Sequence, residues 1–332
     1  MYHHWIFATI WLSLGIIANL LAADVPAVTE PTPFNTESAD TIVSQMQIFP
    51  KDSPWHEDIS SWQVTKDSDA IVSSIGKQKP LRYNTDMGYV LVPPNQKRVA
   101  LTELEYKDES DPGPYPIPDN VPIEGWPVYY ERDLAEKKQT LADVQRDKLN
   151  LGGDRHAIVV DPAAGKLYEF FSLKRTDRGW TAAQASIFDL SSNKLRPDGW
   201  TSADAAGLPI FPAVIRYDEL KRGEIDHALR VTVRRTRKAY VYPATHYASR
   251  LTDANLPRMG ERLRLKADYD ISRFSPEVQT ILKALKKHGM FVADNGLEWA
   301  VSCAADPRIP VLHEELRKVK GEAFEVVERP AK

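Results

Sequence analysis

Short apolar runs separated by turn residues are frequent beyond residue 154 and predict β-strands. Residues 156–160 form one such run, and residues 167–173 are its expected hairpin partner. A further strand is expected over residues 180–190. Apolar and polar residues alternate over 229–234 and over 262–267, with the period of two that is typical of a half-buried strand. The pattern therefore predicts a region of several short strands.

One helix is well marked, over residues 276–287. Ser275 occupies the N-cap position, Pro276 begins the helix, and Gly289 follows its last turn, as helix termini favour. Its apolar residues recur at the spacing of one helical face: Val278, Ile281, Leu282 and Leu285. A thinner apolar stripe predicts another helix over residues 134–150.

Turn-forming residues delimit further elements. Residues 88–92 are expected to form a strand. The alternating prolines over 111–118 predict an extended surface loop, because proline lacks the N–H group that a ladder needs. Residues 290–293 predict a strand, 294–296 a tight turn, and 299–303 a strand that returns from this turn.

Many short strands with few helices predict a mainly-β fold. We expect a single β-sandwich or jelly-roll-like domain over residues 46–330, decorated by one or two helices. Residues 24–45 are polar, rich in Pro, Thr, Ser and Glu, and without periodicity. They therefore predict a flexible leader.

The first residues predict export. Residues 5–23 are almost unbroken apolar sequence, and the polar, helix-breaking Asp24 and Pro26 follow, which is typical of a secretory signal peptide. We expect a signal peptide over residues 1–23 and a secreted or periplasmic protein. The alternative is an uncleaved N-terminal anchor in the membrane, because the run is about as long as a spanning helix requires and no Lys or Arg precedes it.

Composition and charge exclude several classes of protein. Cys303 is the single cysteine, so neither an intramolecular disulfide nor a cysteine-cluster metal site can form. The net charge of −3 is too small to indicate a nucleic-acid partner. Phosphate-loop, dinucleotide, serine-hydrolase and zinc-peptidase signatures are absent, and no cofactor is expected. No metal is expected either, because no two of His156, His227 and His246 have the local spacing of metal ligands. The alternative is that the three histidines converge with a carboxylate in the fold.

The loop over residues 199–210 is the first candidate for a functional site, because connecting loops carry many binding and catalytic residues. Asp204 is a candidate general acid or base, and Trp200 is a candidate platform for a sugar ring. The alternative is structural: Thr201 or Ser202 caps one helical turn, and Asp204 stabilises its start.

Residues 216–230 bring carboxylates close in sequence to a histidine and an arginine. Asp218 is a second candidate acid or base, His227 is a candidate base, and Arg230 is a candidate substrate-binding residue. His227 has the strand parity of Leu229 and therefore points to the apolar face. If that face lines a cleft, His227 is a tunable base. If it lines only the core, His227 is a hydrogen-bonded core residue.

Aromatic and histidine side chains alternate over residues 240–247. Tyr242 is a candidate substrate-binding residue, and His246 is a candidate base. Tyr and His together can abstract the proton next to a uronate carboxylate while Arg neutralises that carboxylate, which is the chemistry of a polysaccharide lyase. The same side chains can instead bind sugars without catalysis or cover a core edge.

Charge is distributed unevenly along the chain. Residues 230–266 hold ten Lys or Arg and two acidic residues, whereas residues 103–133 hold nine Asp or Glu and two basic residues. A basic strand face could bind an acidic polymer. Alternatively, the two segments pack against each other or are both solvated.

Several stretches resemble a loosely described group of secreted bacterial proteins that are sometimes joined to carbohydrate-binding modules. The stretches are 154–156, 199–210, 216–219, 223–230 and 293–296, and the likeness extends over about residues 46–328. The resemblance implies a function outside the cell, in the vicinity of polysaccharide. It implies no particular activity or catalytic residue.

Together these patterns predict a secreted carbohydrate-active protein that cleaves glycosidic bonds of a polysaccharide by hydrolysis or by β-elimination. The alternative from another class is a non-catalytic extracellular glycan-binding or envelope-structural protein. A third reading is an enzyme that acts on an extracellular polymer other than a polysaccharide. The enzyme hypothesis requires that Asp204, Asp218, His227 and His246 converge on one cleft.

Overall fold

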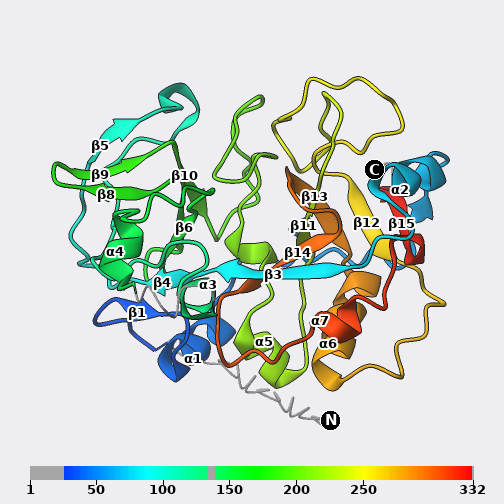
Figure 1. Cartoon of the computed structure of the whole chain (residues 1–332), viewed down its shortest axis with the longest axis horizontal. Coiled ribbons are helices and arrows are strands. Elements are labelled where there is room, and N and C mark those ends of the chain that lie inside the picture. Colours follow the sequence, from blue (N-terminus) through cyan, green and yellow to red (C-terminus); the bar gives the residue numbers. More distant parts are fainter. Residues whose placement is uncertain (1–25, 133–138, 331–332) are drawn as a thin grey trace, which may run out of the picture.

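The computed structural model describes residues 26–132 and 139–330, and three sheets organise them (Figure 1). The signal peptide expected over residues 1–23 lies outside this part of the chain. The five-stranded sheet has the order β1 (Thr32–Pro33), β4 (Tyr89–Leu91), β6 (Ala157–Asp161), β7 (Lys166–Phe171) and β10 (Gln184–Asp189). The three-stranded sheet has the order β5 (Leu101–Leu104), β9 (Gly179–Ala182) and β8 (Lys174–Thr176).

A seven-stranded sheet forms the other half of the molecule. Its order is β2 (Gln63–Val64), β15 (Phe324–Glu328), β12 (Arg262–Leu265), β13 (Met290–Asn295), β11 (Leu229–Val233), β14 (Ala300–Ala304) and β3 (Arg82–Met87). The pairs β11–β13 and β14–β3 are parallel, whereas β11–β14, β12–β13 and β12–β15 are antiparallel. The sheet is therefore mixed.

Seven short α-helices lie among the described residues. They are α1 (Glu37–Gln45), α2 (Ser68–Ile75), α3 (Val128–Arg132), α4 (Leu141–Gln145), α5 (Tyr217–Arg222), α6 (Pro276–Lys287) and α7 (His313–Leu316). About 25% of the described residues are in strands and 19% are in helices. The expected richness in strands is therefore present, but in a mixed α/β arrangement with several sheets and more than one or two helices. The expected mainly-β sandwich does not describe it.

The two larger sheets are connected through one glycine. Gly88 stands alone between β3, which belongs to the seven-stranded sheet, and β4, which belongs to the five-stranded sheet. A Cβ atom at this position would come within 2.9 Å of Pro122 and 3.0 Å of Phe34, so a larger residue would force its neighbours apart. The backbone therefore passes directly from one sheet to the other at a point of close packing.

The five-stranded sheet is buried on both faces. Tyr89, Leu91 and Ile158 belong to a large core that also contains side chains of the seven-stranded sheet. Val90 and Val159 point the other way, into a second core that includes side chains of β5 and β9. Alternate residues along one strand thus serve two cores, and the larger core joins the two halves.

The prediction of a flexible leader over residues 24–45 is wrong for the part of this segment that the structure describes. Residues 32–33 pair with β4, and α1 follows with its N-terminus capped by Thr36. Ala39, Ile42 and Val43 of α1 are buried in the main core. The polar composition of this segment did not predict a helix, because only one side of α1 is apolar.

Most strongly patterned elements are confirmed. The strand and hairpin partner expected from residue 156 onward are β6 and β7, which pair antiparallel. The expected helix is α6, and Gly289 after it has a φ of 64°. The strand expected over 180–190 is instead two strands, β9 and β10. Of the helix expected over 134–150, the described part contains only the short α4.

The prediction of a tight turn over residues 294–296 is also wrong. Strand β13 continues to Asn295, and β14 does not pair with it because β11 lies between the two. The strands expected to be half-buried, β11 and β12, are buried over their whole length, including Arg230, Arg262 and Arg264. Because these arginines are inside the molecule, they do not form an exposed basic strand face.

Candidate functional site

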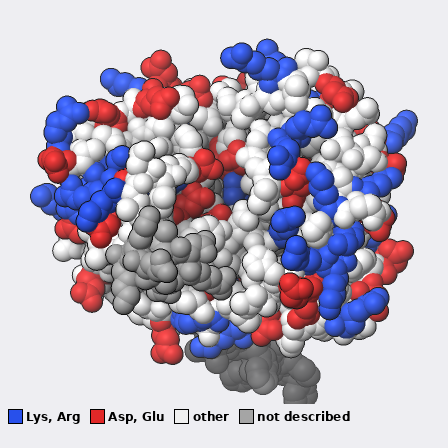
Figure 2. Space-filling model, viewed as in Figure 1, with Lys and Arg blue, Asp and Glu red and all other residues white. Residues whose placement is uncertain are grey.

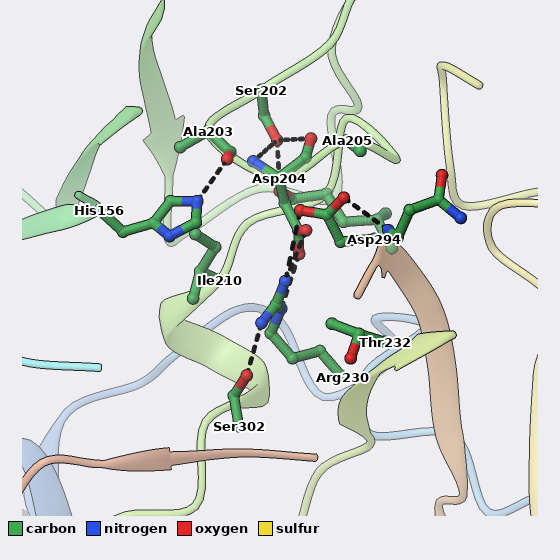
Figure 3. A network of polar contacts seen from close by, with 12 residues as sticks. His156, Ser202, Ala203, Asp204, Ala205, Ile210, Arg230, Thr232, Asp294 and Ser302 are labelled. Atoms are coloured by element: carbon green, nitrogen blue, oxygen red, sulfur yellow. Dashed lines mark hydrogen bonds and ion pairs between the residues drawn. The ribbon is translucent and has the colours of Figure 1, made fainter. Parts of the chain in front are cut away.

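A buried arginine organises a polar network at the centre of the molecule (Figure 3). Arg230 of β11 donates from Nε and Nη2 to the two carboxylate oxygens of Asp204, at 2.8 and 2.7 Å. Its Nη1 donates to the hydroxyl of Ser302 on β14. Its Nη2 also lies 3.9 Å from Oδ2 of Asp294 on β13. This bidentate, desolvated ion pair fixes the loop over 199–210 against the sheet.

Irregularities in the strand pairing bring two more carboxyl groups to this network. On β13 the register with β11 shifts so that Asp294, rather than Ala293, lies opposite Thr232. Thr232 and Arg230 are two residues apart and share a face. On β3 the extra residue of a second shift is Asp86. Such bulges re-aim side chains and are common beside active sites.

His156 and Glu124 form a second charged pair beside the network. Nδ1 of His156 lies 3.0 Å from Oε2 of Glu124, and Nε2 lies 2.9 Å from the carbonyl oxygen of Ala203. Burial opposes protonation of the imidazole, but Glu124 overcomes it and raises the pKa of His156 to about 10. Despite its own burial, the pKa of Glu124 is lowered by His156. The pair is therefore an imidazolium and a carboxylate.

Two aspartates have pKa values close to neutrality. Burial, reinforced by the charge of Glu124, raises the pKa of Asp86 to about 7. Burial, reinforced by Asp204, raises the pKa of Asp294 to about 7. Both shifts follow from placing carboxyl groups away from water and next to other carboxylates. These two side chains can each hold and release a proton at neutral pH.

A cavity of about 350 Å³ opens next to the network. We call it the acidic hollow, because the carboxylates of Glu109, Asp154 and Asp294 line it without any Lys or Arg among its described lining residues. Figure 2 shows acidic side chains deep in a hollow near the middle of this face. The other residues that line it include Tyr106, Phe171, Gln184, Thr201, Ser202 and His246. It combines carboxyl groups with aromatic and hydroxyl side chains.

One group of possible metal ligands occurs in the described part of the chain. Ligand atoms of Glu124, Asp154 and His156 lie within 4.8 Å of one another. Both nitrogens of His156 already face acceptors, a carboxylate and a carbonyl, and each therefore carries a proton. A protonated imidazole cannot ligate a metal, so this arrangement favours the ion pair over a metal centre.

Four of the residues selected from the sequence lie close together. Asp204 and Arg230 are ion-paired, and both are buried. His246 lines the acidic hollow and bonds through Nδ1 to the carbonyl oxygen of Ala205. Trp200 lies in the same loop, where its ring is 5.5 Å from the guanidinium of Arg196. Asp204 is thus held as a counter-ion to Arg230.

Asp218 and His227 lie in a different cluster, which α5 organises. Asp218 accepts a hydrogen bond from Arg222. His227 is buried and lies 2.7 Å from Oε1 of Glu219. Tyr242 lies elsewhere again, exposed beside Arg329. The structure therefore does not bring the four expected catalytic residues together in one cleft. These residues are Asp204, Asp218, His227 and His246.

The sequence analysis missed four carboxyl groups of the central site: Asp86, Glu124, Asp154 and Asp294. A signal for two of them was present. Asp294 directly follows the apolar run of β13, and Asp86 interrupts the strand that leads into the apolar residues of β4. A carboxylate at the end of a buried strand requires an explanation, because charged groups are rarely buried without a partner or a function. Glu124 lies in a loop and had no such signal.

Comparisons of this chain with protein-family models, with curated proteins and with solved structures found no match. The inferences below therefore rest on the residues of this chain. Among the described helices, none has the length and apolar character needed to span a bilayer.

Proposed function

We propose that this protein is an exported carbohydrate-active hydrolase that cleaves glycosidic bonds in the acidic hollow. The observation that carries the proposal is the pairing of Asp294 and Asp154 in the lining of one cavity, with the pKa of Asp294 raised to about 7 by burial and by Asp204. Glycoside hydrolysis requires a carboxyl group that holds a proton near neutral pH and a second, ionised carboxylate.

Asp294 would be the general acid. Its proton would go to the glycosidic oxygen as the bond to the anomeric carbon breaks. Arg230 lies 3.9 Å from its Oδ2, and the Asp204–Arg230 pair would hold its orientation through the reaction. A positioned acid contributes more than one that rotates freely.

Asp154 would be the second carboxyl group of the reaction. It is exposed and lines the same cavity, so it can meet either a water molecule or the sugar itself. In the first case it removes a proton from the attacking water. In the second it attacks the anomeric carbon, and a water molecule that gives its proton to Asp294 then breaks the bond between Asp154 and the sugar. Tyr106 and Phe171 in the lining would supply apolar surface to the sugar rings.

The charge of the hollow favours hydrolysis over β-elimination. A lyase must neutralise the carboxylate of a uronate, and the described lining contains no Lys or Arg to do so. Arg230, proposed from the sequence for that role, is buried and already paired with Asp204. The carboxylates of the hollow would repel a polyuronate, so neutral or amino-sugar polymers are the favoured substrates.

The test is to incubate the purified protein with neutral, amino-sugar and uronate polysaccharides, and to measure reducing ends together with the absorbance of unsaturated products. We expect reducing ends without that absorbance. The variant Asp294→Asn should lower kcat by about 10²- to 10⁴-fold with little change in KM. The matched control is Asp268→Asn, which removes an exposed carboxylate outside the hollow and should retain activity.

A non-catalytic glycan-binding protein is the second candidate, because the same hollow also combines aromatic and carboxylate side chains. In that case oligosaccharides would bind, no reducing ends would appear, and Asp294→Asn would change only the dissociation constant. That result would reject the hydrolase proposal.

A further inference from the structure

A second cavity, of about 510 Å³, lies between the end of α1, the helix α5 and the end of α6. In Figure 1 these three helices lie along the lower side of the molecule. The cavity shares no lining residue with the acidic hollow. We call it the basic cavity. Its size is ordinary for a small-molecule site.

The lining of the basic cavity carries an excess of positive charge. Lys51, Arg216, Arg222 and Lys287 line it, and Asp226 is the one acidic residue among its described lining residues. Behind this lining, Asp218 and Glu219 pair with the two arginines. For Lys51 and Lys287, in contrast, no ion pair is found within the described part of the chain. Two lysines are thus available to a ligand.

His56 also lies in the lining of the basic cavity. Its Nδ1 and Nε2 lie 2.8 Å from the carbonyl oxygens of Asp226 and Ile48, respectively. These two backbone contacts fix the orientation of the His56 ring at the wall of the cavity.

Three buried side chains of the lining have polar atoms without hydrogen-bond partners in the described part of the chain. These atoms are Nη1 of Arg216, Nε1 of Trp55 and Nε2 of His288. Each of the three residues is less than 5% exposed. Buried polar groups without partners cost free energy, so a ligand that fills the cavity and reaches these atoms would gain binding free energy from them.

The types of these atoms define the chemistry of that ligand. Arg216 and Trp55 can only donate, so the ligand must offer acceptors. His288 donates from Nδ1 to the carbonyl oxygen of Glu57 at 3.1 Å, and burial lowers its pKa to about 4. Its Nε2 is therefore an acceptor in the neutral ring, and the ligand must also offer a donor such as a hydroxyl group.

We propose that the basic cavity binds a small hydroxylated anion, of the chemical class of a sugar acid or a sugar phosphate. The oxyanion would lie near Lys51, Lys287 and Arg222, and hydroxyl groups would reach His288. This site does not depend on the hydrolase proposal, because it uses different residues and a different cavity.

Isothermal titration calorimetry with the intact protein tests the inference. The probes are glucuronate, glucose 6-phosphate, inorganic phosphate and glucose, at constant ionic strength. We expect at least one of the two sugar anions to bind saturably and glucose to bind at least about tenfold more weakly, since a charge-assisted hydrogen bond contributes roughly that factor. Glucuronate binding alone would identify a carboxylate site, and glucose 6-phosphate binding alone a phosphate site.

Variants of the exposed cations make the test specific. Lys51→Gln and Lys287→Gln should each weaken binding of the sugar anion by about tenfold, and neither side chain is buried. The matched control is Lys221→Gln, an exposed residue of α5 that does not line the cavity, and it should bind as the wild type does. Absence of saturable binding by both sugar anions, equal binding of glucose, or an equal loss in Lys221→Gln would overturn the proposal.

Discussion

At the scale of single residues, Asp86 and Asp294 stand out because they are carboxyl groups that retain a proton close to neutral pH. In both, burial is the main cause, and a neighbouring carboxylate adds to it. Arg230 opposes the shift of both groups without removing it, because Asp204 has already satisfied the guanidinium. The same desolvation that would make Asp294 a general acid therefore makes the folded state sensitive to pH.

The stability of the protein should fall as the pH rises through the pKa of Asp86. Its pKa is 3.8 in the unfolded chain and about 7 in the folded protein, so between these values the folded state binds more protons and loses stability with rising pH. Asp86→Asn, which is neutral throughout, should therefore be more stable than the wild type by about 1–3 kcal/mol at about pH 8. Near pH 4 the two proteins should differ little.

Urea unfolding at both pH values checks this difference, with Asp268→Asn as an exposed-carboxylate control. An Asn variant that is less stable than the wild type at the higher pH would contradict the assigned environment of Asp86.

At the scale of elements, the sequence pattern was sufficient where apolar residues form a short run or recur along one helical face. It located β6 and β7 correctly as short apolar runs, and α6 correctly because its apolar residues recur at three to four positions. It merged β9 and β10 into one strand because Ala183 between them is itself buried and interrupts no apolar pattern. It assigned the leader wrongly because the apolar side of α1 consists of few residues among polar ones.

The structure predicts that α1 contributes to stability. Ile42→Ala removes a fully buried side chain of the main core and should destabilise the protein by about 2–5 kcal/mol. Gln45→Ala, an exposed position in the same helix, should change the free energy of unfolding by less than about 0.5 kcal/mol. Thermal or urea unfolding of the two variants gives the comparison, and equal stabilities would support a flexible segment instead.

The candidate site was harder to predict than the elements, because side chains from distant segments meet there. Asp204 and Arg230 were selected from the sequence for separate catalytic and binding roles, and in the structure they neutralise each other. The register shifts that bring Asp86 and Asp294 to the site depend on pairing with β14 and β11. A single strand carries no record of its partner's register. The sequence could therefore mark Asp86 and Asp294 as unusual carboxyl groups next to apolar runs, but it could not show that they meet at one site.

At the scale of the whole molecule, opposite charges are separated into two cavities while the net charge is only −3. The acidic hollow and the basic cavity have no lining residue in common, so the two ligands that we propose for them would not compete for the same side chains. Export, which the apolar run over residues 5–23 predicts, would place both cavities in contact with extracellular or periplasmic solutes.

Export can be checked by the N-terminal sequence of the mature protein. Chain recovered from the periplasm or the medium should begin at Asp24, because a signal peptidase cleaves after a small residue such as Ala23. Ala23→Asp should block this cleavage and leave the chain associated with membranes. Wild-type chain that retains Met1 in the membrane fraction would instead support the uncleaved anchor.

The direct passage from β3 to β4 at Gly88 also determines how a ligand would enter the molecule. One continuous stretch of backbone belongs to both large sheets, and side chains of both pack in one core, so the sheets cannot move apart without exposing buried apolar side chains. The central site would accordingly keep its width when it is filled. Selection among glycans would then depend on how well their shape fits a rigid site. Side branches on a polymer would prevent its binding to such a site more effectively than they would prevent binding to a site that closes around its ligand.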